Sequence, residues 1–242
     1  MPRDNADPPV RRPLARGATR GRGDGAPARD AGRTRAAILA GAIAEFAAHG
    51  LGGARVDRIA QRARVNKRML YHYFGAKDAL YLAALEAAYE RIRSEEQRLD
   101  LAHLPPEQGV RELVAFTWRY FLAHPEFMSL LNTENLHRAR HLRRSRKIRA
   151  LHSPLVATLS ELLERGRRDG VFRGGVDAVQ LYVSIAALGY FYLSNSHTLS
   201  TIFGRNLRAP RALAERLEHI TGLVMSALRP GTDLRAPAEA PG

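Results

Sequence analysis

The chain of 242 residues has room for one medium-sized or two small domains, with an ordinary content of 45% hydrophobic and 26% charged residues. It contains no cysteine, which excludes disulfides, thiolate nucleophiles and cysteine-bound zinc. No apolar run approaches the ~18 residues that span a bilayer, and the N-terminus lacks an apolar signal segment, so we expect a cytoplasmic protein without a membrane partner. The net charge of +14 favours a polyanionic partner, although this arginine-rich composition is also typical of a GC-rich genome.

Residues 1–32 are predicted to form a disordered arm, because Arg, Gly, Pro and Asp dominate and almost no large apolar side chain is available for a core. The arginines could add phosphate contacts, but the interspersed aspartates favour an arm with no function of its own. From Thr34, a residue suited to capping a helix, apolar residues recur at helical steps as far as Phe46. Glycines at positions 50, 52 and 53 predict the end of this helix.

Two short amphipathic helices joined by a tight turn are predicted next. The first covers residues 56–63, and the second begins at Lys67 behind Asn66, a good N-cap, with the sequence KRMLYHYF. A short basic and aromatic helix braced against another helix is an arrangement that places side chains in the DNA major groove. Residues 33–80 carry nine Arg or Lys against three acids, so positive charge is concentrated in this segment.

The rest of the chain also has helical periodicity, and the predicted fold class is all-α. A helical domain is expected over residues 81–230, followed by a loose tail over 231–242 that is rich in Pro, Gly and Ala. Helices are predicted over residues 77–98, 107–123, a stretch starting at 127–131, a segment through 155–163 that ends near 170, 177–197 and 210–228.

Residues 34–80 resemble the DNA-binding domain of TetR-type transcriptional repressors. The matching positions are Ile38, Leu39, Ala42, Phe46, Gly50, Val56, Ile59, Ala60, Val65, Lys67, 70–74 and 76–80. The resemblance covers about a fifth of the chain. It implies an N-terminal three-helix helix-turn-helix domain, residues 33–80, joined by a long helix to a C-terminal helical domain for ligand binding and dimerisation. It also implies a homodimeric regulator, expected to be a repressor, that leaves a palindromic operator when a small-molecule inducer binds.

The resemblance implies base contacts from the first turn of the second short helix, and phosphate or groove contacts from its aromatic run. Independently, Leu70 and Phe74 lie four residues apart and can pin this helix to its neighbours, while Arg or Lys can donate to guanine O6 and N7. The candidate DNA-binding residues are Arg55, Arg58, Lys67, Arg68, Met69, Tyr71, His72, Tyr73 and Lys77.

Three positions depart from the family pattern. Ala54 and Arg55 stand where a Ser or Thr often caps the first short helix. Arg64 stands where the turn often has Gly, and a left-handed conformation there would strain it by roughly 1 kcal/mol. Arg68 and Met69 replace the usual Gly-Thr pair, so a different operator sequence is expected.

The aromatic residues of the second half are either plain core or the lining of an apolar pocket between helices. The resemblance favours a pocket, because the C-terminal domain of this family usually holds an inducer. The candidate lining residues are Trp118, Phe121, Phe127, Asn132, Tyr182, Tyr190 and Asn195. The helices over 177–197 and 210–228 are apolar on more than one face, and the family pairs its last long helices in a four-helix dimer interface.

The segment 137–149 has seven Arg or Lys and no acid. It could bind an anionic ligand such as an acyl-CoA phosphate, or nucleic acid, or form a solvated face. His137 and His141 have metal-ligand spacing, but no third ligand is evident and arginines repel cations, so no metal and no cofactor is expected. A non-specific architectural DNA binder and, in the absence of a triad or phosphate loop, a helical enzyme remain the alternatives.

Overall fold

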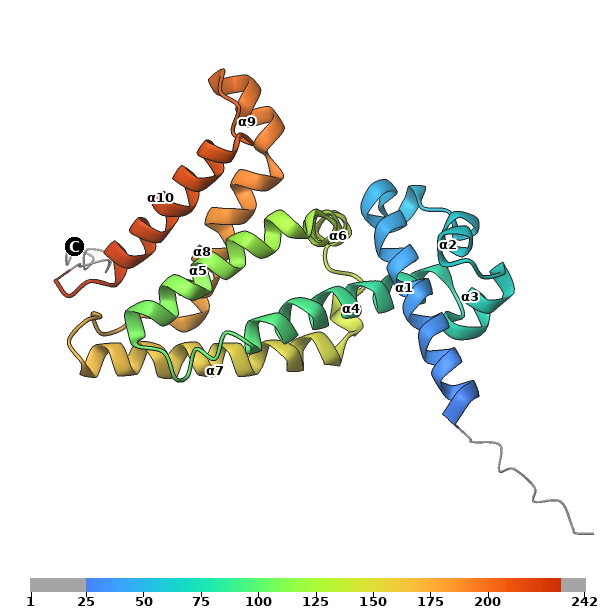
Figure 1. The fold of residues 1–242 in the computed structure, drawn as a ribbon, viewed down its shortest axis with the longest axis horizontal. Helices are drawn as coiled ribbons and strands as arrows, with labels where there is room; N and C mark the ends of the chain where they lie inside the picture. The colour runs from blue at the N-terminus through green and yellow to red at the C-terminus, as the bar shows by residue number, and fades with distance from the viewer. Residues whose placement is uncertain (1–24, 232–242) are drawn as a thin grey trace, which may run out of the picture.

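The computed structural model describes residues 25–231, and every regular element within that range is helical (Figure 1). This confirms the predicted all-α class. The elements are α1 (Gly25–Gly53), α2 (Val56–Ala63), α3 (Lys67–Phe74), α4 (Lys77–Gln97), α5 (Pro106–Ala123), α6 (Pro125–Leu136), the 3-10 turn η1 (Leu142–Arg144), α7 (Arg146–Arg168), α8 (Ala178–Ser194), α9 (Ser196–Phe203) and α10 (Pro210–Leu228).

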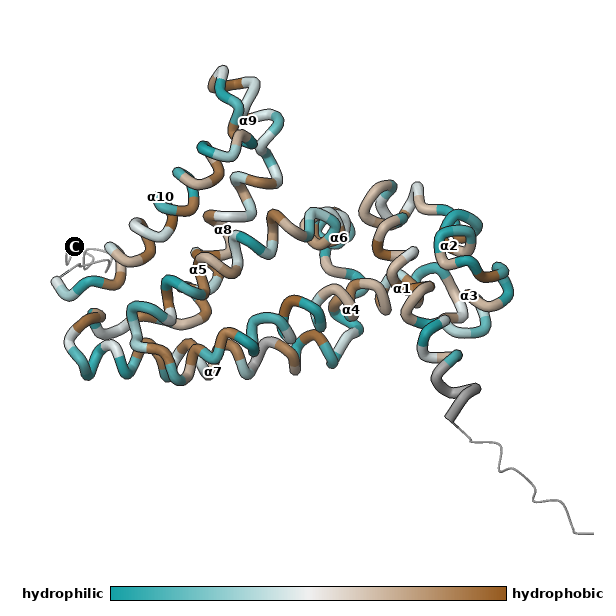
Figure 2. Tube along the Cα trace, in the orientation of Figure 1, coloured by the Kyte–Doolittle hydropathy of each residue, from teal (hydrophilic) through white to brown (hydrophobic). Residues whose placement is uncertain are grey.

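Helix α4 links the two ends of the molecule. Figure 1 shows α1, α2 and α3 grouped at one end, α8, α9 and α10 at the other, and α4 running between them beside α7. Helix α1 packs against α2, α4 and α6, while α5 packs against α7, α8 and α10. Figure 2 shows hydrophobic and hydrophilic residues alternating in short steps along α7 and α10, as expected for helices with one buried face.

The helix boundaries follow from local chemistry. Prolines occupy the first turn of α5, α6 and α10, where their missing N–H would have no helical partner anyway. Side-chain caps begin three other helices. Asn66 accepts from the Met69 N–H at 2.9 Å, the Ser145 hydroxyl accepts from the Ile148 N–H at 3.2 Å, and Asp177 accepts from the Gln180 N–H at 2.7 Å.

Three expectations about the elements were wrong. Helix α1 begins at Gly25, so residues 25–32 of the predicted arm are helical and Thr34 lies inside the helix instead of capping it. The helix expected over 177–197 ends at Ser194, and a separate α9 follows that the sequence did not predict. The remainder of the predicted arm, residues 1–24, and the predicted tail from residue 232 lie outside the described residues.

One segment of α1, Asp30–Gly53, is long and apolar enough by composition to cross a membrane, with a mean hydropathy of 1.3, contrary to our expectation that no run would qualify. The abundance of alanine produces this value. Ile38 and Phe46 within it are fully buried and belong to the same core as residues of α2 and α4, so the segment packs as a core helix does.

Candidate DNA interface

Helices α2 and α3 form the predicted helix-turn-helix unit. The turn depends on Arg64, whose φ of 54° and ψ of 40° place it in the left-handed conformation where the family often has glycine. The Val65 N–H then donates to the Ala60 carbonyl at 3.0 Å, and Asn66 caps α3. Leu70, 2% exposed, anchors α3 in the core beside the fully buried Ile59. The orientation of α3 is therefore fixed by one cap and one buried anchor.

The exposed side of α3 carries basic and aromatic groups. Lys67, Arg68 and His72 are exposed, and the Tyr71 side chain is 47% exposed. Met69 and Tyr73 are half-buried. Such a surface can donate to base edges and to phosphate oxygens.

Phe74 and Tyr73 serve the packing of α3 as much as its surface. Phe74 is half-buried under the Arg35 guanidinium of α1, which lies 5.3 Å from the centre of its ring. Tyr73 makes an edge contact with His72, with ring centres 5.5 Å apart. The aromatic run therefore both holds α3 against α1 and reaches the surface.

Lys67 and Arg68 differ in whether their charged groups already have a partner within the protein. The Lys67 ammonium lies 2.9 Å from the Asp57 carboxylate of α2, and this hydrogen bond and charge raise the pKa of Lys67 above its ordinary value. Arg68 makes no hydrogen bond or ion pair within the part of the chain that the structure describes. Arg68 is thus the basic side chain of the first turn that is most available to a base edge.

Glu45 of α1 holds α2 in place and was not predicted from the sequence. Its side chain is fully buried, and Oε1 accepts a hydrogen bond from the Arg55 backbone N–H at 3.2 Å. Arg58 and Arg62 of α2 lie 3.8 and 3.5 Å from its carboxylate oxygens. Glu45 therefore satisfies the backbone N–H of the α2 N-cap residue, and it ties the predicted phosphate-contacting Arg58 to α1. The only sequence signal was an acid on the apolar stripe of α1.

Of the nine predicted DNA-contacting residues, six belong to α3, Arg58 belongs to α2, Arg55 precedes α2, and Lys77 begins α4. Arg55 is the N-cap residue of α2 and is exposed. Lys77 begins α4, is half-buried, and its ammonium donates to the Gly52 carbonyl at 3.4 Å. The contacts of these residues with DNA remain predictions.

The predicted pocket residues occupy several environments. Trp118, Phe121 and Phe127 are 3–4% exposed and pack within the aromatic core, and only Phe127 of these borders a cavity described below. Tyr190 donates a hydrogen bond to Asn132. Tyr182 accepts one from Arg93 at 2.5 Å, and Asn195 donates to the Phe191 carbonyl at 2.9 Å at the end of α8. The structure thus does not bring the seven residues into one site, and their role in ligand binding remains a prediction.

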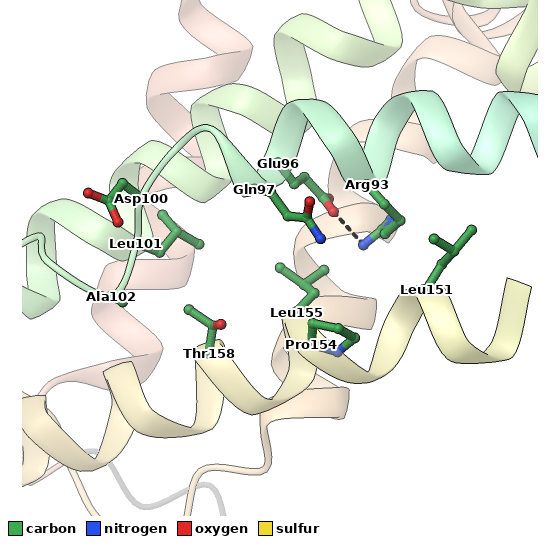
Figure 3. A pocket seen from close by; sticks show the side chains of 10 residues that line it. All are labelled: Arg93, Glu96, Gln97, Asp100, Leu101, Ala102, Leu151, Pro154, Leu155 and Thr158. Carbon is green, nitrogen blue, oxygen red and sulfur yellow. Dashed lines mark ion pairs between the residues drawn. The ribbon is translucent and has the colours of Figure 1, made fainter. Parts of the chain in front are cut away.

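Two pockets, both partly open to solvent, lie along α4. One, of about 220 Å³, is bordered by Phe127 of α6, by α1 and by the middle of α4. The other, of about 190 Å³, lies between the C-terminal half of α4, the loop after it and α7 (Figure 3). Its polar residues Arg93 and Glu96 were not predicted, because an Arg-Glu pair three residues apart on a helix is usually a solvated pair.

The arginine-rich segment behaves differently from a regular helix. Arg138 and Ala139 adopt left-handed conformations with φ of 54° and 56°, so the four-residue spacing of His137 and His141 does not fall on a continuous helix. His141 is buried, and its Nδ1 lies 3.0 Å from the buried Glu134 carboxylate. Among the described residues no group of three His, Asp or Glu is placed to hold a metal ion. All seven Arg and Lys of 137–149 are exposed.

Large apolar side chains remain exposed at the end of the molecule opposite α3. They are Val179, Val183 and Phe191 of α8, Ile202 and Phe203 of α9, and Leu223 of α10, all between 46% and 71% exposed. We call the α8 and α10 part of this set the α8/α10 face. An apolar surface of this kind on one protomer usually marks a contact with another chain.

Comparisons with known proteins agree with this arrangement. Residues 38–84 match the family model of bacterial regulatory proteins of the tetR family, and residues 106–224 match the tetracyclin repressor-like C-terminal domain. The HTH-type transcriptional repressor NicS of Pseudomonas putida is 42% identical over 205 residues, which cover 85% of this chain and 97% of NicS. The HTH-type transcriptional repressor SCO4008 of Streptomyces coelicolor is 40% identical over 111 residues, 45% of this chain and 53% of that protein.

A solved structure shows the same fold at low sequence identity. The TetR family transcription regulator from Marinobacter aquaeolei has a TM-score of 0.63 and 20% identity, covering 84% of this chain and 98% of its own. The helix-turn-helix geometry, the two family models and the relation to NicS lead to one conclusion. The chain belongs to the TetR family of bacterial transcriptional regulators and is a DNA-binding repressor.

Proposed function

We propose that this repressor acts as a homodimer in the bacterial cytoplasm, reading a palindromic operator with α3 and leaving it when a small molecule binds the C-terminal domain. The observation that carries the DNA-reading half is the first turn of α3, where the exposed and unpaired Arg68 stands on a helix fixed by the Asn66 cap and Leu70. A rigidly held helix keeps its side chains in register with base edges. The similarity to NicS, a transcriptional repressor, supports repression rather than activation by this chain.

Within this proposal the basic residues have separate roles. Arg68 donates to a base edge, while Lys67, held by Asp57, and Lys77, held at the Gly52 carbonyl, contact phosphates near their present positions. Arg55, Arg58, Tyr71, His72 and Tyr73 contribute backbone and groove contacts, and Met69 packs on base edges.

Substitution of Arg68, compared with a control that removes the same charge elsewhere, tests whether Arg68 reads a base. We expect Arg68→Ala to weaken binding to an operator selected from random DNA by roughly 10-fold or more, with a much smaller effect on scrambled DNA, because a bidentate base contact is worth ~1–3 kcal/mol. Arg168→Ala removes the same charge from an exposed position at the end of α7 and serves as control. Equal losses on both DNAs for Arg68→Ala would assign it to phosphate binding instead.

The α8/α10 face supports the homodimer. Its exposed Val183 and Leu223 would be covered by the same face of a second copy, which gives a two-fold axis. Two-fold symmetry matches a palindrome whose half-sites lie about one DNA turn, ~34 Å, or somewhat more apart.

The position of α4 supports a coupling between ligand binding and DNA binding. Its first residue, Lys77, follows α3 closely, and its C-terminal half lines the 190 Å³ cavity. A ligand that binds the released geometry more tightly than the DNA-bound one shifts the population toward release.

A further inference from the structure

The arginine-rich residues 137–149, which connect α6 to the first turn of α7, carry positive charge that the protein itself leaves mostly unpaired. We call them the 137–149 segment. The Lys147 ammonium lies 2.6 Å from the Glu90 carboxylate of α4, and Arg149 donates to the Arg143 carbonyl at 3.4 Å. Within the described part of the chain, five exposed guanidinium groups of the segment have no hydrogen-bond or ion-pair partner: those of Arg138, Arg140, Arg143, Arg144 and Arg146. These five groups are available to an anionic partner.

Buried contacts fix the backbone of the segment. The Glu134 side chain, 2% exposed, accepts hydrogen bonds from the backbone N–H groups of His141 and Leu142 at 2.7 and 3.0 Å. Its other oxygen lies 3.0 Å from the His141 Nδ1. The Ser145 hydroxyl donates to the Glu86 carboxylate of α4 at 2.7 Å. The arginines therefore project from a loop whose course is held at both ends, and such a preorganised surface loses less conformational freedom when it binds.

The conformation and the charges of the segment do not favour stability of the isolated chain. Arg138 and Ala139 have φ of 54° and 56°, a left-handed conformation that is strained for residues with a Cβ. Arg146 and Lys147 occupy the first turn of α7, where the helix dipole disfavours positive charge. Strained backbone of this kind is typical of functional segments, and an anionic partner relieves the repulsion between the cations.

The segment lies next to the DNA-binding helices. The His141 ring packs edge-on against Tyr81 of α4 with ring centres 4.9 Å apart, and Tyr81 packs in the same way against Phe46 of α1 at 5.0 Å. Tyr81 follows Lys77, a predicted phosphate contact, by about one helical turn. Figure 1 shows the chain passing from α6 to α7 beside the N-terminal end of α4. The unpaired arginines are therefore at the end of the C-terminal domain that adjoins α1, α2 and α3.

An extended polyanion fits this surface better than a small anion. The charges are spread along thirteen residues and are all exposed, and the two pockets along α4 are lined by other residues. We propose that the 137–149 segment contacts phosphates of the DNA backbone next to those reached by α2 and α3. Contacts with phosphates carry no sequence information, so the segment adds affinity to operator and non-operator DNA alike. This rests on the DNA-binding function proposed above and adds a second contact surface in the C-terminal domain.

The salt dependence of DNA binding tests this contact. The test variant of the full chain combines Arg140→Ala, Arg143→Ala and Arg144→Ala, and fluorescence anisotropy is measured over a series of salt concentrations. Each phosphate contact contributes ~0.9 to the slope of log K against log salt, so we expect the slope to become shallower by about 2–3. At physiological salt we expect the Kd for a selected operator and the Kd for scrambled DNA to rise by the same factor, at least ~10-fold.

A second triple variant is the matched control. Arg98→Ala, Arg111→Ala and Arg168→Ala remove the same charge from exposed positions at the end of α4, on α5 and at the end of α7. Charges far from the DNA are screened within ~8 Å at physiological ionic strength, so this variant should keep nearly the wild-type slope. Thermal unfolding checks that both variants are folded. Equal slopes in the test and control variants, or a loss of affinity confined to the operator, would overturn the proposal.

Ethylation of single DNA phosphates tests for direct contact. We expect wild-type binding to be weakened by ethylation at a few phosphates that no longer matter to the test variant. The same set of sensitive phosphates in both proteins would overturn the proposal. Inorganic tripolyphosphate is the small-anion probe. If it binds the wild type and not the test variant, while the two proteins share one DNA salt slope, the segment is a small-anion site and the proposed DNA contact is wrong.

The phosphate contact and the operator-reading function can fail separately. The ratio of operator to scrambled-DNA affinity tests the reading function, and the difference in salt slope tests the segment. A slope difference without operator preference leaves the phosphate contact standing and refutes operator reading. Operator preference without a slope difference has the opposite meaning.

Discussion

Glu96 makes the stability of this protein depend on pH in an unusual direction. Most buried carboxylates have a lowered pKa because they are paired, and they stabilise the fold above that pKa. For Glu96, burial outweighs the opposing charge of Arg93 and raises the pKa to about 7, compared with 4.5 for the exposed group. The folded state therefore holds the proton more tightly than the unfolded state between these two values. Its stabilising contribution is complete below pH 4.5 and is lost as the pH rises through 7.

The size of the effect follows from the two pKa values. Each unit of difference corresponds to about 1.4 kcal/mol, so between pH 5 and pH 8 the Glu96 contribution to the unfolding free energy falls by about 2–3 kcal/mol. For a domain of this size, that is a loss of roughly 5–10 °C in Tm. Urea unfolding at both pH values, with fixed salt and protein concentration, measures it.

Glu96→Gln is the matched control, because it keeps the shape of the side chain and cannot titrate. We expect the pH 5 to pH 8 difference in unfolding free energy to be about 2–3 kcal/mol smaller in this variant, whatever its absolute stability. All other groups are identical in the two proteins and cancel in the comparison. An identical pH dependence in the two proteins would contradict this expectation and would show that Arg93 keeps Glu96 ionised throughout this range.

Three further predictions concern the turn, the cap and the dimer. Arg64→Gly should be about 1 kcal/mol more stable to urea than Arg64→Ala, because only glycine avoids the strain of a φ of 54°; equal stability would contradict this. Asn66→Ala should cost about 1 kcal/mol and accelerate hydrogen exchange of the Met69 amide, and an unchanged exchange rate would argue against the cap. Leu223→Lys should shift sedimentation from dimer to monomer, and a persistent dimer would exclude the α8/α10 face.

Sequence reasoning succeeded where local chemistry decides the structure. The bounds of α2 and α10 and the start of α3 were predicted correctly. For α3 and α10, Asn66 and Pro210 are strong local signals for a helix start. The left-handed conformation considered for Arg64 was also found. Each of these depends on residues within one or two turns of each other.

Contacts between distant segments were not predictable in the same way. Glu45 and Arg55 are ten residues apart and meet because α1 and α2 pack together. The Arg93–Glu96 cavity needs α7, more than fifty residues further along the chain, to form its apolar wall. No periodicity within α4 indicates which of its surfaces α7 covers or leaves hollow.

Aromatic composition alone does not distinguish residues that line a pocket from residues that fill the core. Trp118 and Phe121 were candidates because large aromatic residues often line pockets. In the structure these two side chains mainly fill the core, packing against Tyr192 and Phe127. The loop that separates His137 from His141 similarly depends on consecutive left-handed residues that helical spacing could not reveal.

The proposed function requires α3 to read a specific symmetric DNA sequence. The most direct test selects binding sites from genomic fragments, including the DNA flanking its own gene, and measures anisotropy on the enriched site against scrambled DNA at fixed physiological salt. We expect a palindromic site bound ~10³-fold or more tightly than scrambled DNA. Enrichment of no sequence, with equal and steeply salt-dependent binding to all DNA, would contradict it and indicate a non-specific binder.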